Sequence, residues 1–184
     1  FENNFSELFL SLTSSISNIG FSLNNSSNNL SFIFLILVII GGSFFSTSSG
    51  IRFLKIYSLF KYSINEILSY SRPKNIYINK HLFSKDTFKL DEIYKYFLSV
   101  IVFIISLLIL TFLLTLSGID FESSFKLSIL TIMNTVNSSM FGLADFSFYD
   151  LHFITKYYLI FFMIIGRLEL LTLLIICKKF LFKN

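Results

Sequence analysis

The chain has 184 residues, of which 54% are hydrophobic and only 14% are charged. An average soluble domain has about a quarter of its residues charged, and a soluble domain of this length cannot bury so much apolar surface, so the composition predicts a membrane protein. The single cysteine excludes an internal disulfide and a multi-cysteine metal site, and the meaning of the net charge of +4 depends on its distribution.

Basic residues alternate with neutral or acidic segments along the chain. Residues 51–96 hold nine of the fifteen Lys and Arg, whereas residues 1–29 hold none and residues 118–152 hold only Lys126. Since cytoplasmic loops of membrane proteins are enriched in Lys and Arg, this predicts a multi-pass protein of the cell (inner or plasma) membrane with residues 51–96 and the C-terminus in the cytoplasm. A nucleic-acid-binding surface would gather basic residues without intervening spans, so the expected partner is the lipid bilayer and not nucleic acid.

The first predicted elements are too short to cross a bilayer. Residues 5–21 form a short apolar helix pattern that ends in small polar residues, and residues 30–40 would extend roughly 16 Å as a helix, about half a hydrocarbon core. The sequence GGSFFSTSSG at residues 41–50 then interrupts the apolar run. Residues 51–70 continue as a cationic helix, which Pro73 ends.

The second half of the chain contains the strongest membrane signal. Residues 97–116 are twenty residues without a charge, which predicts a spanning helix. Residues 121–134 form another short helix, for which Ser123 or Ser124 is the expected N-cap, and a polar turn follows. Residues 156–180 are predicted to span the membrane again.

The order of these elements forms a weak internal repeat. A short helix, a polar turn and a spanning helix occur in residues 5–61, and the same series follows a spanning helix in residues 92–182. This plan is typical of pore loops, in which a short helix dips into the membrane and returns as extended chain beside a water-filled axis. The first copy lacks its leading helix, so we expect a fragment of a longer subunit.

The expected fold is therefore an all-α, multi-spanning membrane protein built from helix–pore-loop–helix repeats. Residues 1–72 would end one repeat, with a pore helix, a filter and a broken spanning helix. Residues 73–91 would be a cytoplasmic connector, and residues 92–184 would form the next repeat, with its spanning helix, pore helix, filter and second spanning helix.

Two polar turns at matching places in the repeats are candidates for cation binding. SNIGF at residues 17–21 has small side chains and Gly20, which adopts backbone conformations closed to other residues. NTVNS at residues 134–138 follows the second short helix. Rings of backbone carbonyls can replace a cation's hydration shell, but ordinary turns after amphipathic helices would explain the same residues, and the local sequence leaves both interpretations open.

The interruption at residues 41–50 lies at bilayer depth, where unpaired backbone groups are costly. Its three glycines and five hydroxyl side chains would suit a loop that lines a water-filled cavity, since hydroxyls satisfy freed backbone groups. A kink that allows close helix packing is the alternative.

Arg167 and Glu169 lie near the middle of the last predicted span. A charge at the bilayer centre costs about 2.5–3.5 kcal/mol on insertion scales and by default indicates a functional site. The two residues are two positions apart, so they point to different faces of a helix and do not pair with each other. Structural ion pairs with other partners are the alternative interpretation.

No catalytic pattern occurs in the sequence. His81 and His152 are isolated in predicted loops, and no zinc-protease, nucleophile-elbow or phosphate-loop motif is present. We therefore expect neither an enzyme nor a cofactor.

Three stretches together resemble one family, the bacterial Trk/Ktr-type potassium uptake subunits. GGSFFSTSSGIRFLKI (41–56) is similar to the family's glycine-rich intramembrane loop, FMIIGRLELLTLL (162–174) to its last helix, and FLSLTSSISNIGFS (9–22) to a pore helix and filter. The resemblance covers nearly the whole chain. It implies the C-terminal half of a subunit in which four helix–pore-loop–helix repeats surround one axis, with the end of the third repeat and the fourth present here.

The resemblance also implies roles for individual residues. The third and fourth filter segments, which would bind potassium through backbone carbonyls, would be Ser17, Asn18, Ile19, Gly20, Asn134, Thr135, Val136 and Asn137. The gate beneath them would be Gly41, Gly42, Ser43, Ser46, Thr47, Gly50 and Arg167. Asn137 stands where the family's fourth filter has a glycine, so it would need an uncommon backbone conformation, which Asn tolerates better than most residues.

We therefore expect uptake of potassium, or another monovalent cation, through a carbonyl filter gated by the intramembrane loop and Arg167. The partners that the resemblance implies are the N-terminal half of the same subunit, a second copy in a homodimer and a cytoplasmic nucleotide-binding regulatory subunit. The alternative function is a truncated, non-transporting membrane remnant or an assembly partner of such a transporter.

Overall fold

The computed structural model describes residues 2–22, 30–40, 51, 53–71, 90–137, 139–143, 146–167 and 179. These ranges contain helices and no strand, which confirms the predicted all-α class. The elements are α1 (Glu2–Ile16), α2 (Ser31–Ile40), α3 (Phe53–Ser71), α4 (Leu90–Leu116), α5 (Phe121–Met133), the short 3-10 turn η2 (Ser139–Phe141) and α6 (Phe153–Arg167).

Helix α4 carries the clearest membrane signal of the described residues. Its stretch Glu92–Leu116 is the one described segment with the length and hydropathy of a membrane span. The helix covers Leu90–Leu116 and includes the whole predicted span at residues 97–116. It ends where Gly118 takes a φ of 86°. The second predicted span, 156–180, is described as far as Arg167 and again at Lys179.

Helix α5 begins at a capping aspartate. The Asp120 carboxylate accepts a hydrogen bond from the Glu122 backbone N–H at 3.2 Å. Ser124, one of the two caps expected from the sequence, instead lies inside the helix and donates through its Oγ to the Ile119 carbonyl at 3.3 Å. The prediction of Ser123 or Ser124 was wrong because the acidic residue one turn earlier competes better for the free N–H groups.

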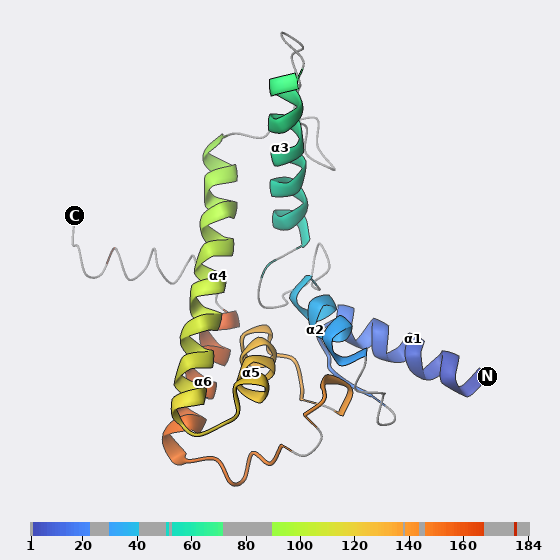
Figure 1. Cartoon of the computed structure of the whole chain (residues 1–184), viewed down its shortest axis with the longest axis vertical. Helices are drawn as coiled ribbons and strands as arrows, with labels where there is room; N and C mark the ends of the chain where they lie inside the picture. The colour runs from blue at the N-terminus through green and yellow to red at the C-terminus, as the bar shows by residue number, and fades with distance from the viewer. Residues whose placement is uncertain are drawn as a thin grey trace.

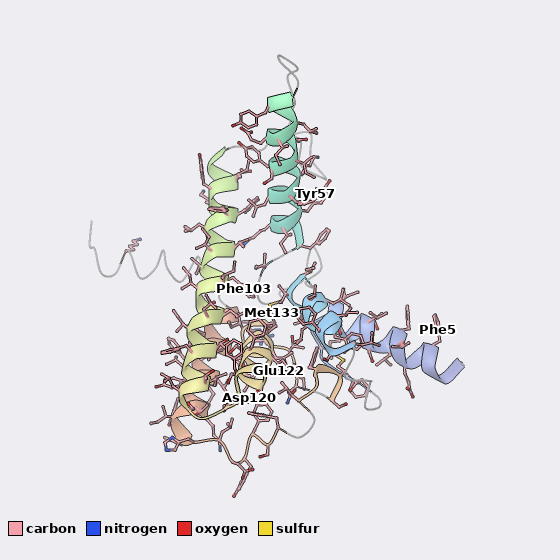
Figure 2. The ribbon with its side chains drawn as sticks, viewed as in Figure 1. Phe5, Tyr57, Phe103, Asp120, Glu122 and Met133 are labelled. Carbon is pink, nitrogen blue, oxygen red and sulfur yellow. The ribbon has the colours of Figure 1, made fainter. Side chains whose placement is uncertain are left out.

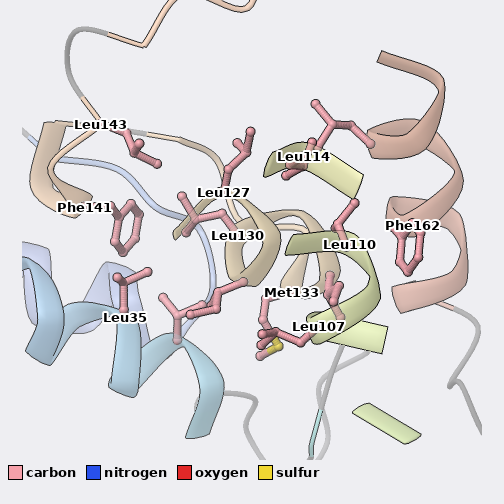
Figure 3. Packing of buried hydrophobic residues seen from close by; sticks show 14 of the residues in the cluster. Leu35, Leu107, Leu110, Leu114, Leu127, Leu130, Met133, Phe141, Leu143 and Phe162 are labelled. Atoms are coloured by element: carbon pink, nitrogen blue, oxygen red, sulfur yellow. The ribbon is translucent and has the colours of Figure 1, made fainter. Parts of the chain in front are cut away.

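The core lies around α5, which packs against α4 on one side, α6 on another and α2 on a third (Figure 1). Buried leucines of α4 and α5 meet there with Phe141 of η2 and Phe162 of α6 (Figure 3). Helix α1 packs on α2 and projects away from this core, whereas α3 lies beside the first part of α4 (Figure 1). Helix α2 thus packs against both short helices, α1 and α5.

Candidate functional site

The first candidate segment, residues 17–20, closes the C-terminal end of α1. Asn18 takes a left-handed φ of 58°, and the Ile19 backbone N–H then donates to the Ser14 carbonyl at 3.0 Å. This is the hydrogen bond of a Schellman-type helix end, which requires a residue that tolerates positive φ. Gly20 follows with a φ of 81°. Two positive-φ residues, one on each side of Ile19, thus turn the chain sharply away from the helix.

The second segment, residues 134–137, closes α5 in the same way. Asn134 has a φ of 53°, and the Thr135 N–H donates to the Leu130 carbonyl at 2.9 Å. The equivalence of the two helix ends pairs Asn18 with Asn134, an offset of 116 residues (134 − 18). Among the described residues other than glycine, positive φ occurs at Asn18 and Asn134, so the uncommon conformation expected at Asn137 is absent there.

The structure brings the two segments into direct contact. The Val136 backbone N–H donates to the Ile19 carbonyl at 3.3 Å. A Cβ added at Gly20 would lie 2.2 Å from the Val136 carbonyl oxygen and 2.8 Å from the Thr135 methyl group. Gly20 is therefore required twice, once for its backbone conformation and once for the close approach of the other segment.

Polar side chains hold the first segment in place. The hydrogen-bond network sets the Asn18 amide so that its nitrogen donates to the carbonyls of Ser15 and Val38, at 3.2 and 3.1 Å. The Phe21 backbone N–H donates to the Ser14 hydroxyl at 2.6 Å. Because Val38 lies in the last turn of α2, the Asn18 amide connects the segment to the helix that follows it in the chain.

The second segment is held by α6. The Asn134 amide nitrogen donates to the Met163 carbonyl at 3.0 Å. One turn further along α6, a Cβ at Gly166 would lie 2.2 Å from the carbonyl oxygen of Ile132, so the two backbones are in contact there. The GRLE motif was singled out for its charges, and the packing role of Gly166 was missed. A glycine inside an apolar membrane helix is the signal that could have indicated it.

Two buried oxygens in the second segment have no hydrogen-bond partner among the described residues. They are the Thr135 hydroxyl and the Asn137 side-chain carbonyl. An uncompensated buried polar atom is destabilising by about 1–3 kcal/mol, and such atoms are uncommon in native structures. Neutral hydroxyl and carbonyl oxygens are ligands for hard cations, so these atoms give the segment unused capacity to coordinate one.

The predicted gate is described only in part. Its loop residues, Gly41, Gly42, Ser43, Ser46, Thr47 and Gly50, lie outside the described residues. Arg167 is described, is exposed and is the last residue of α6. Since it follows Gly166, the contact between Gly166 and Ile132 fixes its backbone beside the last turn of α5.

Acidic and metal-binding side chains do not gather at this site. Within the described ranges, no three of His, Cys, Asp and Glu lie together. Neither α1 nor α5 carries a basic residue in its last turn. The site therefore offers neutral oxygens and the partial negative charge of two helix C-termini, an arrangement that favours a cation.

Comparison with known proteins identifies a family and a solved structure that this chain resembles. The sequence matches the model of a family described as TrkH, cation transport protein, over residues 2–182. The fold is similar to the crystal structure of the potassium transporter TrkH from Vibrio parahaemolyticus, with a TM-score of 0.82 and 22% sequence identity. That match covers 95% of this chain and 37% of the other chain, so this chain spans well under half the length of that transporter. A search of curated proteins finds no match.

Proposed function

We propose a function from one premise: this chain belongs to the TrkH family of cation transport proteins. Family membership confirms the prediction of a Trk-type membrane transporter subunit that is not an enzyme. We propose that the chain takes part in moving potassium, or a similar monovalent cation, across the membrane. The carbonyl groups of residues 17–20 and 134–137 would supply two sides of the filter.

The contact between the two segments is the observation that supports this proposal most directly. Segments 116 residues apart share one helix-end geometry, and Val136 and Ile19 are joined by a backbone hydrogen bond. Ordinary loops at the ends of two separate helices have no reason to converge with matched geometry. Pore loops do, because each repeat contributes one segment to a common axis.

The electrostatics of the site also suit a monovalent cation. The segments follow the C-terminal ends of α1 and α5, where the helix dipoles place partial negative charge. A carbonyl filter replaces the hydration shell of such an ion without holding it as tightly as carboxylates would. The buried oxygens of Thr135 and Asn137, which have no hydrogen-bond partner among the described residues, would add to the polar lining.

Gating would involve the elements that follow each segment. We propose that the loop at residues 41–50, which continues from α2, and Arg167, at the end of α6, restrict passage below the filter. A positive charge in a low-dielectric path repels cations, so Arg167 would delay permeation until the loop or α6 moves. The complete assembly would contain four such repeats, a second copy of the subunit and a cytoplasmic nucleotide-binding regulator that docks on the basic residues 51–96.

Growth at low potassium tests the proposal. The complete reading frame that contains this chain is expressed in a strain without its own potassium uptake systems, with membrane insertion verified. Rescue of growth, together with potassium uptake into proteoliposomes that hold the purified protein, is the expected result. Normal insertion without rescue or uptake would contradict the transporter function and support an assembly partner that does not transport.

A further inference from the structure

The two left-handed asparagines share more than their backbone conformation. The side-chain amides of Asn18 and Asn134 each donate a hydrogen bond to a backbone carbonyl of the helix that follows in the same repeat. The acceptors are Val38 in α2 and Met163 in α6. The donor–acceptor distances are 3.1 and 3.0 Å. The same asparagine-to-helix hydrogen bond thus occurs twice, at equivalent positions of the repeat.

Asparagine fits this position for two separate reasons. After glycine, asparagine is among the residues that best tolerate a positive φ. Its amide supplies two N–H donors at a short distance from the backbone. Glycine would keep the helix end but remove the donor, and serine or threonine would provide a hydroxyl but resist the left-handed conformation.

The two acceptor carbonyls differ in what the asparagine provides. Val38 lies in the last turn of α2, and its carbonyl accepts a hydrogen bond from the Asn18 amide. Met163 lies four residues before the end of α6, and the Asn134 amide adds a second link beside the contact of Gly166 with Ile132. The first segment therefore depends more on its asparagine than the second does.

We propose that Asn18 and Asn134 are positioning residues that fix the two carbonyl-bearing segments to α2 and α6, so that a displacement of either helix alters the cation site. This inference rests on the proposed transport function. In this proposal the asparagine side chains do not contact the cation. They set the distance between each segment and the helix behind it, and they connect the filter mechanically to the two helices that lead toward the predicted gate.

Asn18→Gly and Asn134→Gly separate the two properties of asparagine. Each variant keeps the left-handed helix end and removes only the amide. In proteoliposomes that contain the complete protein, Asn18→Gly should lower the ratio of potassium to sodium flux about fivefold, the effect of one lost hydrogen bond. Asn134→Gly should lower the ratio less, because Gly166 still holds α5 against α6. The amount of folded protein in the membrane should stay the same, which a general loss of folding would not produce.

A matched control lies on α1. Thr13 is exposed and its hydroxyl donates only to the Phe9 and Leu10 carbonyls of the same helix. Thr13→Ala removes this side-chain hydrogen bonding from the same helix and should leave the flux ratio unchanged. Helix content and unfolding temperature, measured for each variant, show whether the protein is folded.

Asn134→Asp provides a test that a purely structural role would not pass. An ionised carboxylate cannot donate to the Met163 carbonyl, whereas a protonated carboxyl donates one O–H. The flux ratio of Asn134→Asp should therefore recover as pH falls, while that of the wild-type protein and of Asn134→Gly should not.

The outcomes separate the two proposals. If the wild-type protein transports no cation, the proposed function fails. If it does transport, but the glycine variants are folded with unchanged flux ratios, or Asn134→Asp shows no recovery at low pH, the positioning role is overturned.

Discussion

Helices α1 and α5 end in the same way, yet they lie in very different surroundings. Every residue of α5 from Leu127 to Met133 is buried. Helix α1 buries a face of small hydroxyl residues, Ser11, Ser14 and Ser15, and exposes large apolar side chains such as Phe5, which is 72% exposed. Figure 2 shows Phe5 on the projecting helix and Met133 inside the core.

This difference shows which of the two segments is held in position by helices of the described residues. Helix α5 is fixed by α2, α4 and α6, so the second segment has a complete scaffold. Helix α1 packs on α2 and buries its small serine residues, a residue type that allows helices to approach closely. Its apolar face needs lipid or further protein around it. The first segment therefore depends on a few polar contacts and on Gly20.

The largest effect is expected from Gly20→Ala, which breaks the contact between the two segments. Alanine with a φ of 81° is strained by about 1–2 kcal/mol, and its Cβ would overlap the Val136 carbonyl oxygen. We expect potassium flux to fall by roughly tenfold or more, since about 1.4 kcal/mol corresponds to a factor of ten in a rate. Flux into proteoliposomes measures it.

Gly118→Ala is the matched control for this variant. Gly118 also has a positive φ, of 86°, but a Cβ there would meet nothing within 4 Å. It should lose stability through backbone strain and keep its transport rate per folded molecule. Equal losses of flux in the two variants would show that strain alone, and not the contact with Val136, explains the effect.

Gly166→Ala tests the scaffold of the second segment. Its Cβ would lie 2.2 Å from the Ile132 carbonyl oxygen, a backbone atom that cannot move aside easily. We expect α6 to shift away from α5 and the free energy of unfolding to fall by about 1–3 kcal/mol. Thermal unfolding in detergent measures the change. Ile164→Ala, at an exposed position of the same helix, should be nearly neutral; an equal loss there would argue against a specific contact.

The sequence predicted the order of the elements well because hydrophobic periodicity and length are local properties. The short helix before each polar turn, the half-length apolar helix at Ser31–Ile40 and the long helix through Leu116 all occur. The helix boundaries were less accurate where capping decides them, as at Asp120. Competition between neighbouring caps depends on side-chain reach, which a pattern of residue types does not contain.

The candidate site was predicted as two segments but not as a set of contacts. Small polar residues after short helices indicated residues 17–20 and 134–137. The links from Asn18 to Val38 and from Asn134 to Met163 join residues that are 20 (38 − 18) and 29 (163 − 134) positions apart. No local pattern specifies such pairs. The uncommon backbone conformation expected at Asn137, as the counterpart of a family glycine, does not occur there, because positive φ among the described non-glycine residues falls at Asn18 and Asn134, where the two helices end.

Arg167→Ala is expected to raise cation flux several-fold, by removing a positive charge from a low-dielectric path. Arg167 directly follows Gly166, which holds α6 against α5. Because this contact and Asn134 are both unchanged in Arg167→Ala, the rise in flux is expected without a shift of α6. Lys156→Ala removes a positive charge from the other end of α6, where Lys156 donates to the Tyr149 carbonyl, and should leave flux unchanged. Unchanged flux in a transporting Arg167→Ala variant would contradict the gating role.

The smallest effect is expected from Thr135→Val, which replaces a buried, unpartnered hydroxyl by a methyl group of similar volume. Removing such a polar atom should leave stability unchanged or raise it by about 1 kcal/mol. If the hydroxyl is a spare cation ligand, the KM for potassium should rise about twofold to fivefold at the same time. Thr131→Val is the control, because the buried Thr131 hydroxyl already donates to the Leu127 carbonyl at 2.6 Å. It should not change the KM. A loss of stability in Thr135→Val, with no change in KM, would mean that the Thr135 hydroxyl stabilises the fold and does not bind the cation. The second segment would then differ from the first in its scaffold and not in its capacity to coordinate a cation.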